Sequence, residues 1–588
     1  PPPSGPGAAR TAADPCPARS VGRLELQGAP RRPWTRLVRT AAPGESALHL
    51  AEPVDWPIGA EILVTQSAAG EREELRRVAA IEDDGLTLRI DAPLANEHLG
   101  VWHWHDEGAA PSDLRAAVAL LERNVVVQAG DESMRAGGAF QFGVHTGGFH
   151  GGVFRLRNVQ LTRSGQAGNF GRYSSHWHHY TMAGRNIDII NGASYLKDNV
   201  YRDTFQRAVV VHGTDYATVT GNVAYRAKGH NFFTEEGPER YALFEGNLAV
   251  AAVPHPILLG DDSTPAGFWI PGFTGWHRHN LAVGCANGWK LNVQAGAGAR
   301  QSGMDFHNNS AHACGFGWRL FPPHQPPTPN VFGTFVAFRC STCMFYYSSG
   351  NINHLDHRFI ECGRAVHLNH YMNGLHAAPF FTDLVLVGSI DPSARSANAG
   401  SPAIHSPKDD EHWLVSGMHV SNYHDSAVLF GCFQTACTMR YERTVWVNST
   451  RRTTSTGPLS GIFHDLDGTL TGFPNGWVSG DKAFNHWEDG VCIAGDSRFV
   501  DGLACGLADG SLRLRRLFVH DAEPWQLDGK DLLVTTPAGT DRVAFDTKTF
   551  GWHVYAIANR SYELEPDDAN SWQSMATMYS HWNYVFET

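Results

Sequence analysis

Short apolar runs separated by turn residues fill the first part of the chain. Glycine, proline and aspartate end each run, a pattern typical of strands. No apolar pattern with helical spacing extends beyond residues 116–123. We therefore predict an N-terminal β-rich region over residues 35–124, preceded by a linker over residues 1–34. The strands expected in this region are 46–50, 61–64 and 86–90.

From residue 125 the apolar runs follow a repeated asparagine. The intervals between these asparagines are 23, 25, 33 and 29 residues, and most precede a small residue and a short strand, at Asn199, Asn222, Asn247, Asn280 and Asn309. Uneven intervals of this size are typical of a parallel β-helix, because its turns accept insertions while its strands stay stacked. A propeller blade would need about 40–45 residues. We predict an all-β fold, a right-handed parallel β-helix (solenoid), over residues 125–445.

Four cysteines share one position of this repeat, namely Cys285, Cys314, Cys340 and Cys362. Equivalent positions on adjacent coils lie about 4.8 Å apart, which is within the Cα separation that a disulfide accepts. The column is either a set of buried thiols or holds one or two disulfides between coils, and both interpretations stay open. The Cys340-Ser-Thr-Cys343 spacing has no second Cys-x-x-Cys, which disfavours zinc there.

The repeat fades near residue 440. A connection rich in serine, threonine and arginine follows at residues 448–458. Alternating strand patterns then return, and solenoids need caps that cover their last apolar coil. We predict a C-terminal β-rich cap over residues 446–588, with strands at 512–519, 531–534, 543–550 and 552–557.

Composition narrows the class of protein. The chain has 588 residues, too many for a single compact core. Its formal net charge of -12 argues against a nucleic-acid partner. No run reaches the roughly 18 apolar residues of a membrane span. The opening Pro1–Gly7, with no initiator methionine, indicates a linker exposed by processing or a fragment of a longer chain. Glycosylation triplets begin at Asn308, Asn448 and Asn559.

Histidines cluster on three successive coils. In the segment 171–180, His176 and His178 are two residues apart and therefore project to one face of a strand. Further polar residues follow about one and two repeats later, where stacking makes them neighbours. The candidate set is Arg172, His176, His178, Arg207, His212, Asp215, His230, Glu235 and Glu236.

Four interpretations of this cluster stay open. It is a set of stacked polar ladders, a catalytic site for an acidic polysaccharide, a non-catalytic glycan-binding surface, or a metal site. Arginines would hold uronate carboxylates, and a histidine or glutamate would act as general acid or base. The catalytic candidates are Arg172, His176, His178, Arg207, His212 and His230, and the substrate contacts include Arg172, Arg207, Glu235 and Glu236. Histidine ligands favour zinc and carboxylates favour calcium, with His176, His178, His212 and Asp215 as candidates.

These segments resemble the fibrocystin-like proteins and the related transmembrane and secreted hyaluronidases. The resemblance runs from about residue 35 to 475 and implies an eight-glycine domain followed by parallel β-helix repeats. The run at residues 261–270 is closer to the fibrocystin-like branch. The matching segments are 171–178, 203–214, 229–239, 261–270 and 463–472.

Two residues depart from the pattern of this family. Ser174 stands where the family has proline, and Arg185 stands where it has aspartate. Arg185 removes a base and adds an anion contact, so we count it among the substrate contacts. The resemblance transfers fold more directly than chemistry. We expect an extracellular or cell-surface ectodomain that binds an acidic polysaccharide, with hyaluronidase-like cleavage as an open question. The alternative is a structural or adhesive component that binds surface proteins.

Overall fold

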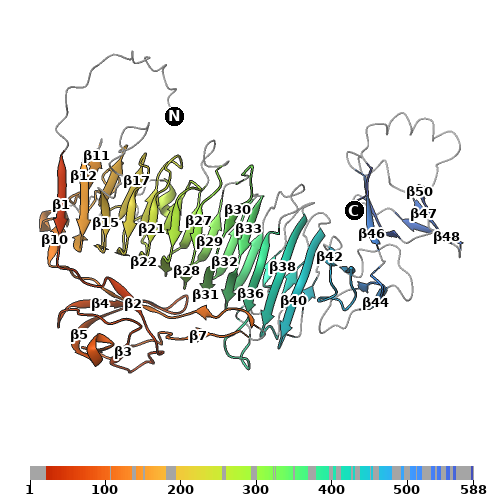
Figure 1. Cartoon of the computed structure of the whole chain (residues 1–588), viewed down its shortest axis with the longest axis horizontal. Helices are drawn as coiled ribbons and strands as arrows, with labels where there is room; N and C mark the ends of the chain where they lie inside the picture. Colours follow the sequence, from red (N-terminus) through yellow and green to blue (C-terminus); the bar gives the residue numbers. More distant parts are fainter. Residues whose placement is uncertain are drawn as a thin grey trace, which may run out of the picture.

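The computed structural model shows a long stack of coils with smaller sheets at its side and far end (Figure 1). Within the described residues there is no α-helix, and hence no helix of the length and apolarity that a membrane crossing requires. Short 3-10 turns occur at Asp83–Gly85, Asp131–Met134 and Gly260–Ser263. The structure describes residues 22–105, 108–134, 141–149, 152–179, 194–254, 260–292, 301–321, 324, 326–347, 351–368, 379–395, 397, 402–405, 412–424, 428–430, 438–449, 452–454, 462–479, 492–494, 503–510, 513–519, 531–536, 539–544, 551–556, 561–564 and 584–586.

Three parallel sheets form the walls of the coils, and each coil adds one strand or two to a sheet. The predicted parallel β-helix is therefore confirmed. The first wall, called the short sheet, contains β1 (Arg23–Gln27), β12 (Val153–Arg157), β15 (Tyr195–Lys197), β18 (Thr218–Thr220), β21 (Leu243–Glu245), β24 (Trp276–Arg278) and β27 (Asp305–His307).

The second wall is called the site sheet, because it holds the clustered histidines. Its strands are β11 (Thr146–Phe149), β14 (Ser175–His178), β17 (Val209–His212), β20 (Phe232–Thr234), β23 (Ala266–Ile270), β26 (Asn287–Leu291), β29 (Phe316–Leu320), β32 (Thr342–Tyr346), β35 (Arg364–Leu368), β37 (Ile404–His405), β39 (Leu429–Phe430) and β41 (Thr453–Thr454).

The third wall, called the long sheet, is parallel through β42 and antiparallel beyond it. Its strands are β10 (Val125–Gln128), β13 (Val159–Thr162), β16 (Val200–Arg202), β19 (Val223–Tyr225), β22 (Leu248–Val250), β25 (Leu281–Val283), β28 (Asn309–His312), β30 (Asn330–Phe332), β31 (Phe335–Phe338), β33 (Ile352–Leu355), β34 (His357–Ile360), β36 (Phe381–Val387), β38 (His412–Ser421), β40 (Thr438–Val447), β42 (Ile462–Asp465), β43 (Gly476–Ser479), β44 (Cys492–Ala494) and β45 (Leu503–Cys505).

The repeated asparagines form a ladder at the turn between the short and long sheets. Asn199 Nδ2 donates to Asn222 Oδ1 at 3.0 Å, and the contact repeats from Asn222 to Asn247 and from Asn247 to Asn280. Each amide also donates to a backbone carbonyl of the preceding coil. The side chains are fully buried, so the ladder satisfies polar groups that would otherwise destabilise the turn.

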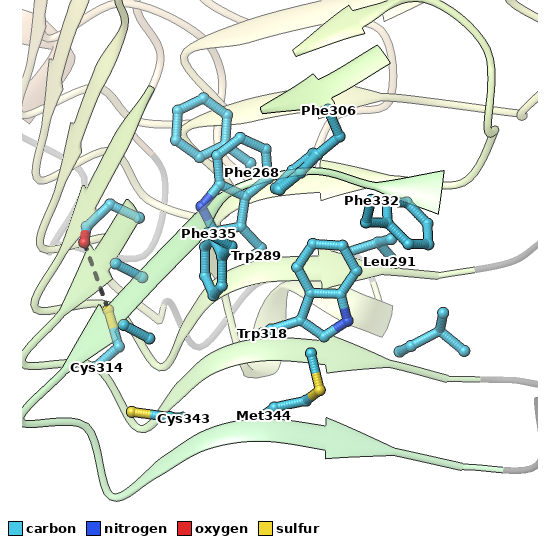
Figure 2. Close-up of a cluster of buried hydrophobic side chains, with 14 of the residues drawn as sticks. Phe268, Trp289, Leu291, Phe306, Cys314, Trp318, Phe332, Phe335, Cys343 and Met344 are labelled. Atoms are coloured by element: carbon cyan, nitrogen blue, oxygen red, sulfur yellow. Dashed lines mark hydrogen bonds between the residues drawn. The ribbon is translucent and has the colours of Figure 1, made fainter. Parts of the chain in front are cut away.

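Stacked aromatic side chains fill the interior of the coils (Figure 2). Phe268, Trp289, Trp318 and Met344 occupy one register position on successive strands of the site sheet. The rings of Phe268 and Trp289 stack with centroids 4.2 Å apart. Phe306, from the short sheet, meets Trp318 edge to face at 5.0 Å. Side chains of this size give each coil a large apolar area to bury.

The cysteine column continues this interior. Cys285, Cys314 and Cys340 are buried thiols. The fourth member, Cys362, is bonded to Cys343 of β32 rather than to its neighbour in the column. The column thus has three thiols, and the disulfide between Cys343 and Cys362 ties adjacent coils together.

A six-stranded antiparallel sheet covers part of the long sheet. Leu63, Ala117 and Ala119 pack on Val223 and other apolar residues that point outward from the coils. This N-terminal sheet contains β2 (Trp34–Arg36), β9 (Ala117–Leu120), β4 (Glu61–Val64), β5 (Glu74–Glu82), β6 (Thr87–Ile90) and β3 (Ala47–His49), and is followed in space by the hairpin β7 (Trp102–His103) and β8 (Ser112–Asp113).

Two expected boundaries differ from the observed strands. Residues 1–34 are predicted as a linker, yet β1 lies within them and pairs in register with β12. Parallel stacking also continues past residue 445, through β42. Beyond it lie two antiparallel three-stranded sheets, formed by β49 (Gly551–Ala556), β46 (Arg513–Val519) and β51 (Tyr584–Phe586), and by β48 (Gly539–Ala544), β47 (Asp531–Thr536) and β50 (Ser561–Leu564).

Candidate functional site

Strands β14 and β17 position the clustered histidines. The two strands pair in parallel, with His178 opposite His212. Trp177 points into the coil, where its ring packs edge to face on Phe154 with centroids 5.6 Å apart. Since side chains alternate along a strand, His176 and His178 point to the outer face. The order histidine, tryptophan, histidine therefore places both imidazoles on the same side of the site sheet.

Three imidazoles converge on this face. One ring nitrogen from each of His176, His178 and His212 lies within 4.8 Å of the other two. His178 Nδ1 and His212 Nδ1 are 3.0 Å apart. The rings of His176 and His212 are nearly parallel, with an interplanar angle of 9°. Donor atoms gathered in this way are suitable for a metal ion with nitrogen ligands.

His176 has a fixed tautomer. Its Nδ1 lies 3.1 Å from the Gly171 carbonyl oxygen, and because a carbonyl only accepts, Nδ1 carries the proton. Its Nε2 therefore presents a lone pair, and this buried atom has no hydrogen-bond partner. Burial, reinforced by the adjacent His178, lowers the pKa of His176 to about 3. The side chain is thus a neutral acceptor across the physiological range.

Two glutamates flank His212. Glu235 Oε2 lies 3.4 Å from His212 Nδ1, and Glu236 Oε1 lies 3.2 Å from His212 Nε2. Tyr173 donates to Glu235 Oε1 at 3.3 Å, and burial raises the pKa of Tyr173 to about 12. The buried Glu239 accepts from the backbone N–H groups of Gly237 and Glu236, which holds the loop that carries the two glutamates.

A buried ionic triad lies beside this face. Asp262 accepts from Arg207 Nε at 3.0 and 3.2 Å, and His230 Nε2 lies 2.9 Å from Asp262 Oδ1. The Ala266 N–H donates to His230 Nδ1, which leaves the imidazole proton on Nε2. Burial opposes ionisation of Asp262, but His230 and Arg207 hold its pKa below the ordinary value. Arg207 and His230 are nearly or fully buried, so both support the structure around the site.

The remaining predicted residues are spread around the cluster. Arg172 is exposed, and its Nη1 lies 3.0 Å from His145 Nε2. Asp215 Oδ1 accepts from the Arg240 N–H at 2.7 Å, and it is not among the three side chains with clustered ligand atoms. Arg185 lies outside the described residues, as does Asn559.

Sequence reasoning did not assign three residues that belong here. His145 and His179 border the cluster, and the ring centroid of His179 lies 4.4 Å from that of His212. Asp262 was within a family-matching run but had no role, because its partners lie on coils that are 55 and 32 residues away. The buried Arg207, two coils before Asp262, was the signal, because a buried guanidinium requires a carboxylate partner.

Comparison with known proteins places the cluster within a defined β-helix. Residues 141–315 match the family model described as CEMIP beta-helix. Human fibrocystin-L is 24% identical over 622 residues, covering 90% of this chain and 14% of that protein. The predicted family resemblance is confirmed. The chain thus corresponds to a small part of this fibrocystin-like relative.

Other matches extend the comparison. A G8 domain-containing protein of Dictyostelium discoideum is 26% identical over 341 residues, covering 57% of this chain and 27% of that protein. Among solved structures, the tailspike protein gp49 from Pseudomonas phage LKA1 aligns with a TM-score of 0.28 and 9% identity, covering 92% of this chain and 82% of that chain.

Proposed function

We propose that this chain is an extracellular, glycan-binding β-helix of fibrocystin-like type whose binding site is the histidine cluster on β14 and β17. The observation that carries the proposal is the buried Nε2 lone pair of His176, which has no partner beside two further imidazoles. A polar atom without a partner in this setting costs free energy unless a ligand satisfies it. The ligand class we assign is a transition metal together with an acidic sugar.

The donor set favours zinc over calcium. Three neutral imidazole nitrogens suit zinc, whereas calcium takes about six to eight oxygen ligands. A metal-binding histidine is usually oriented by a hydrogen bond from its other ring nitrogen, and the Gly171 carbonyl accepts such a bond from His176 Nδ1. His176, His178 and His212 would hold the ion, which would supply positive charge toward a sugar carboxylate. The exposed Arg172 would contact the same carboxylate at the rim.

Cleavage of the polysaccharide is a second candidate function. Glu236 is half exposed and lies 3.2 Å from His212 Nε2. A carboxylate and an imidazole in this geometry can hold a proton between them and pass it to a bound sugar. If the protein has this activity, hyaluronan, chondroitin or pectin-type polymers should become shorter when they are incubated with it.

The test compares His176→Ala with a matched control. His367 of β35 occupies the same register position of the site sheet as His176, several coils further along. We expect the wild type and His367→Ala to retain zinc after dialysis and to bind an acidic glycan. His176→Ala should fold with unchanged circular dichroism, lose zinc, and bind the glycan at least about ten-fold more weakly. Equal zinc content and glycan affinity in the two variants would refute the proposal.

A further inference from the structure

A second concave site lies between the N-terminal sheet and the coils. It is a groove of about 500 Å³, within the size range of sites for small ligands. Trp34 and Arg36 of β2 and Trp102 of β7 form one side. Arg358 of β34 and Asp356, which precedes it, form the other. None of His176, His178 and His212 lines the groove, which lies along the long sheet rather than the site sheet.

The charged side chains that line this groove are paired with one another. Arg36 Nε lies 3.4 Å from Asp113 Oδ2. Arg358 donates to both carboxylate oxygens of Asp356, at 2.8 and 2.6 Å. The two arginines and two aspartates of the lining balance each other, and Arg115 lies beside them, where it donates to both carboxylate oxygens of Asp113 and lies over the Trp102 ring. They still offer planar donors and acceptors to a neutral ligand with hydroxyl and amide groups.

Aromatic side chains complete the lining. Trp102 is 46% exposed although it is a large apolar side chain. Trp34 is partly buried, and its Nε1 donates to the Gly246 carbonyl at 2.8 Å, which fixes the plane of the indole. Indole faces pack on the apolar C–H face of a sugar ring, while polar groups at the rim bind its hydroxyls. The lining therefore suits a neutral saccharide.

One residue of the groove can carry such a saccharide covalently. Asn308 lies in the turn between β27 and β28, is exposed, and begins an Asn-Asn-Ser triplet. Its side-chain amide makes no hydrogen bond with any described residue. Asn448, the other described acceptor, is engaged, because its Nδ2 donates to Asn422 Oδ1 at 2.9 Å and to the Pro392 carbonyl at 3.2 Å.

We propose that Asn308 carries an N-linked glycan whose first N-acetylglucosamine residues fold into this groove and fasten the N-terminal sheet to the coils. In the attachment step, Asn308 Nδ2 forms a bond to C1 of the sugar and releases one proton. The bond from C1 to the diphosphate of a lipid-linked oligosaccharide donor breaks, and the lipid diphosphate leaves. The proposal rests on the extracellular location given above and is independent of the histidine site.

The experiment measures glycan protection in the chain secreted from a eukaryotic cell. Glycopeptide mass spectrometry should find Asn308 occupied. Peptide N-glycosidase should release this glycan at least about ten-fold more slowly from the native than from the denatured protein. An unoccupied Asn308, or equal release rates in the two states, would overturn the proposal without affecting zinc binding by His176.

A variant pair locates the protection. Trp102→Ala should bring native release close to the denatured rate, because it removes the exposed indole that covers the sugar. Trp104→Ala is the matched control, since Trp104 is 74% exposed and does not line the groove. Circular dichroism and Tm verify folding of both. Equal protection in both variants would show that the glycan does not use the groove.

Discussion

The Nδ1 atoms of His178 and His212 face each other across adjacent coils at 3.0 Å. Two N–H groups cannot point at each other at this distance, so at least one of these nitrogens carries a lone pair. The contact thus presents either a shared proton or two metal ligands. In either state, at most one of the two Nδ1 atoms carries a proton.

We predict that His212→Ala lowers zinc affinity by about 100-fold or more, because one of three nitrogen ligands is lost. Isothermal titration calorimetry measures the affinity, with His367→Ala as control. Equal zinc affinity in His212→Ala and His367→Ala would contradict ligation by His212.

Asp262→Asn should destabilise the protein strongly. The substitution keeps the shape of the side chain but leaves the buried Arg207 guanidinium without its counter-charge, which costs about 3–5 kcal/mol. Asp215→Asn, at a partly exposed position, should cost less than about 1 kcal/mol. The urea midpoint, followed by tryptophan fluorescence, measures the difference. Similar midpoints for the two variants would show that Arg207 does not depend on Asp262.

Acid should destabilise the coils between pH 6.5 and 3. Burial lowers the pKa of four histidines from 6.5 to about 3, at His176, His277, His312 and His357. In this window the unfolded chain binds protons that the folded chain does not, so stability is full above pH 6.5 and falls as pH decreases. Each group contributes up to about 1.4 kcal/mol per pH unit. Calorimetric Tm values measure the slope, and His277→Phe should make it shallower. An unchanged slope in that variant would contradict this assignment.

Asn247→Ala should break the asparagine ladder at its middle. Asn247 Oδ1 accepts from both the backbone and side-chain N–H groups of Asn222, and its Nδ2 donates to Asn280. The variant leaves buried donors without acceptors, at a cost of about 2–4 kcal/mol. Thermal unfolding measures the loss, with Asn353→Ala, outside this ladder, as the control. Equal Tm values would show that the ladder adds no stability.

The fold could be predicted from the sequence because the repeated asparagines recur once per coil. Five successive coils place a buried amide at the same turn, and Asn199, Asn222, Asn247, Asn280 and Asn309 mark it. The same logic predicted the shared face of His176 and His178, which depends only on strand alternation. These features are set by residues close in the sequence or at one repeat position.

Features that join unlike positions were not predicted. Cys362 bonds to Cys343, which lies inside a strand and outside the predicted column, whereas the repeat register left open whether the four column cysteines are thiols or bond between coils. The link between Asp262 and Arg207 depends on which coils stack and where their loops fold. Strand β1 was included in a linker, although its sequence Arg-Leu-Glu-Leu-Gln alternates as a strand does, because its partner β12 is far along the chain.

The position of β1 has a consequence for the N-terminal sheet. The chain pairs with the short sheet at β1, forms the N-terminal sheet, and returns to the long sheet at β10. The N-terminal sheet is therefore an insertion within the first coil, tethered at both ends. A double tether keeps its effective concentration near the coils high, so a weak docking surface suffices for nearly complete occupancy. Loss of a few contacts would loosen this sheet without releasing it.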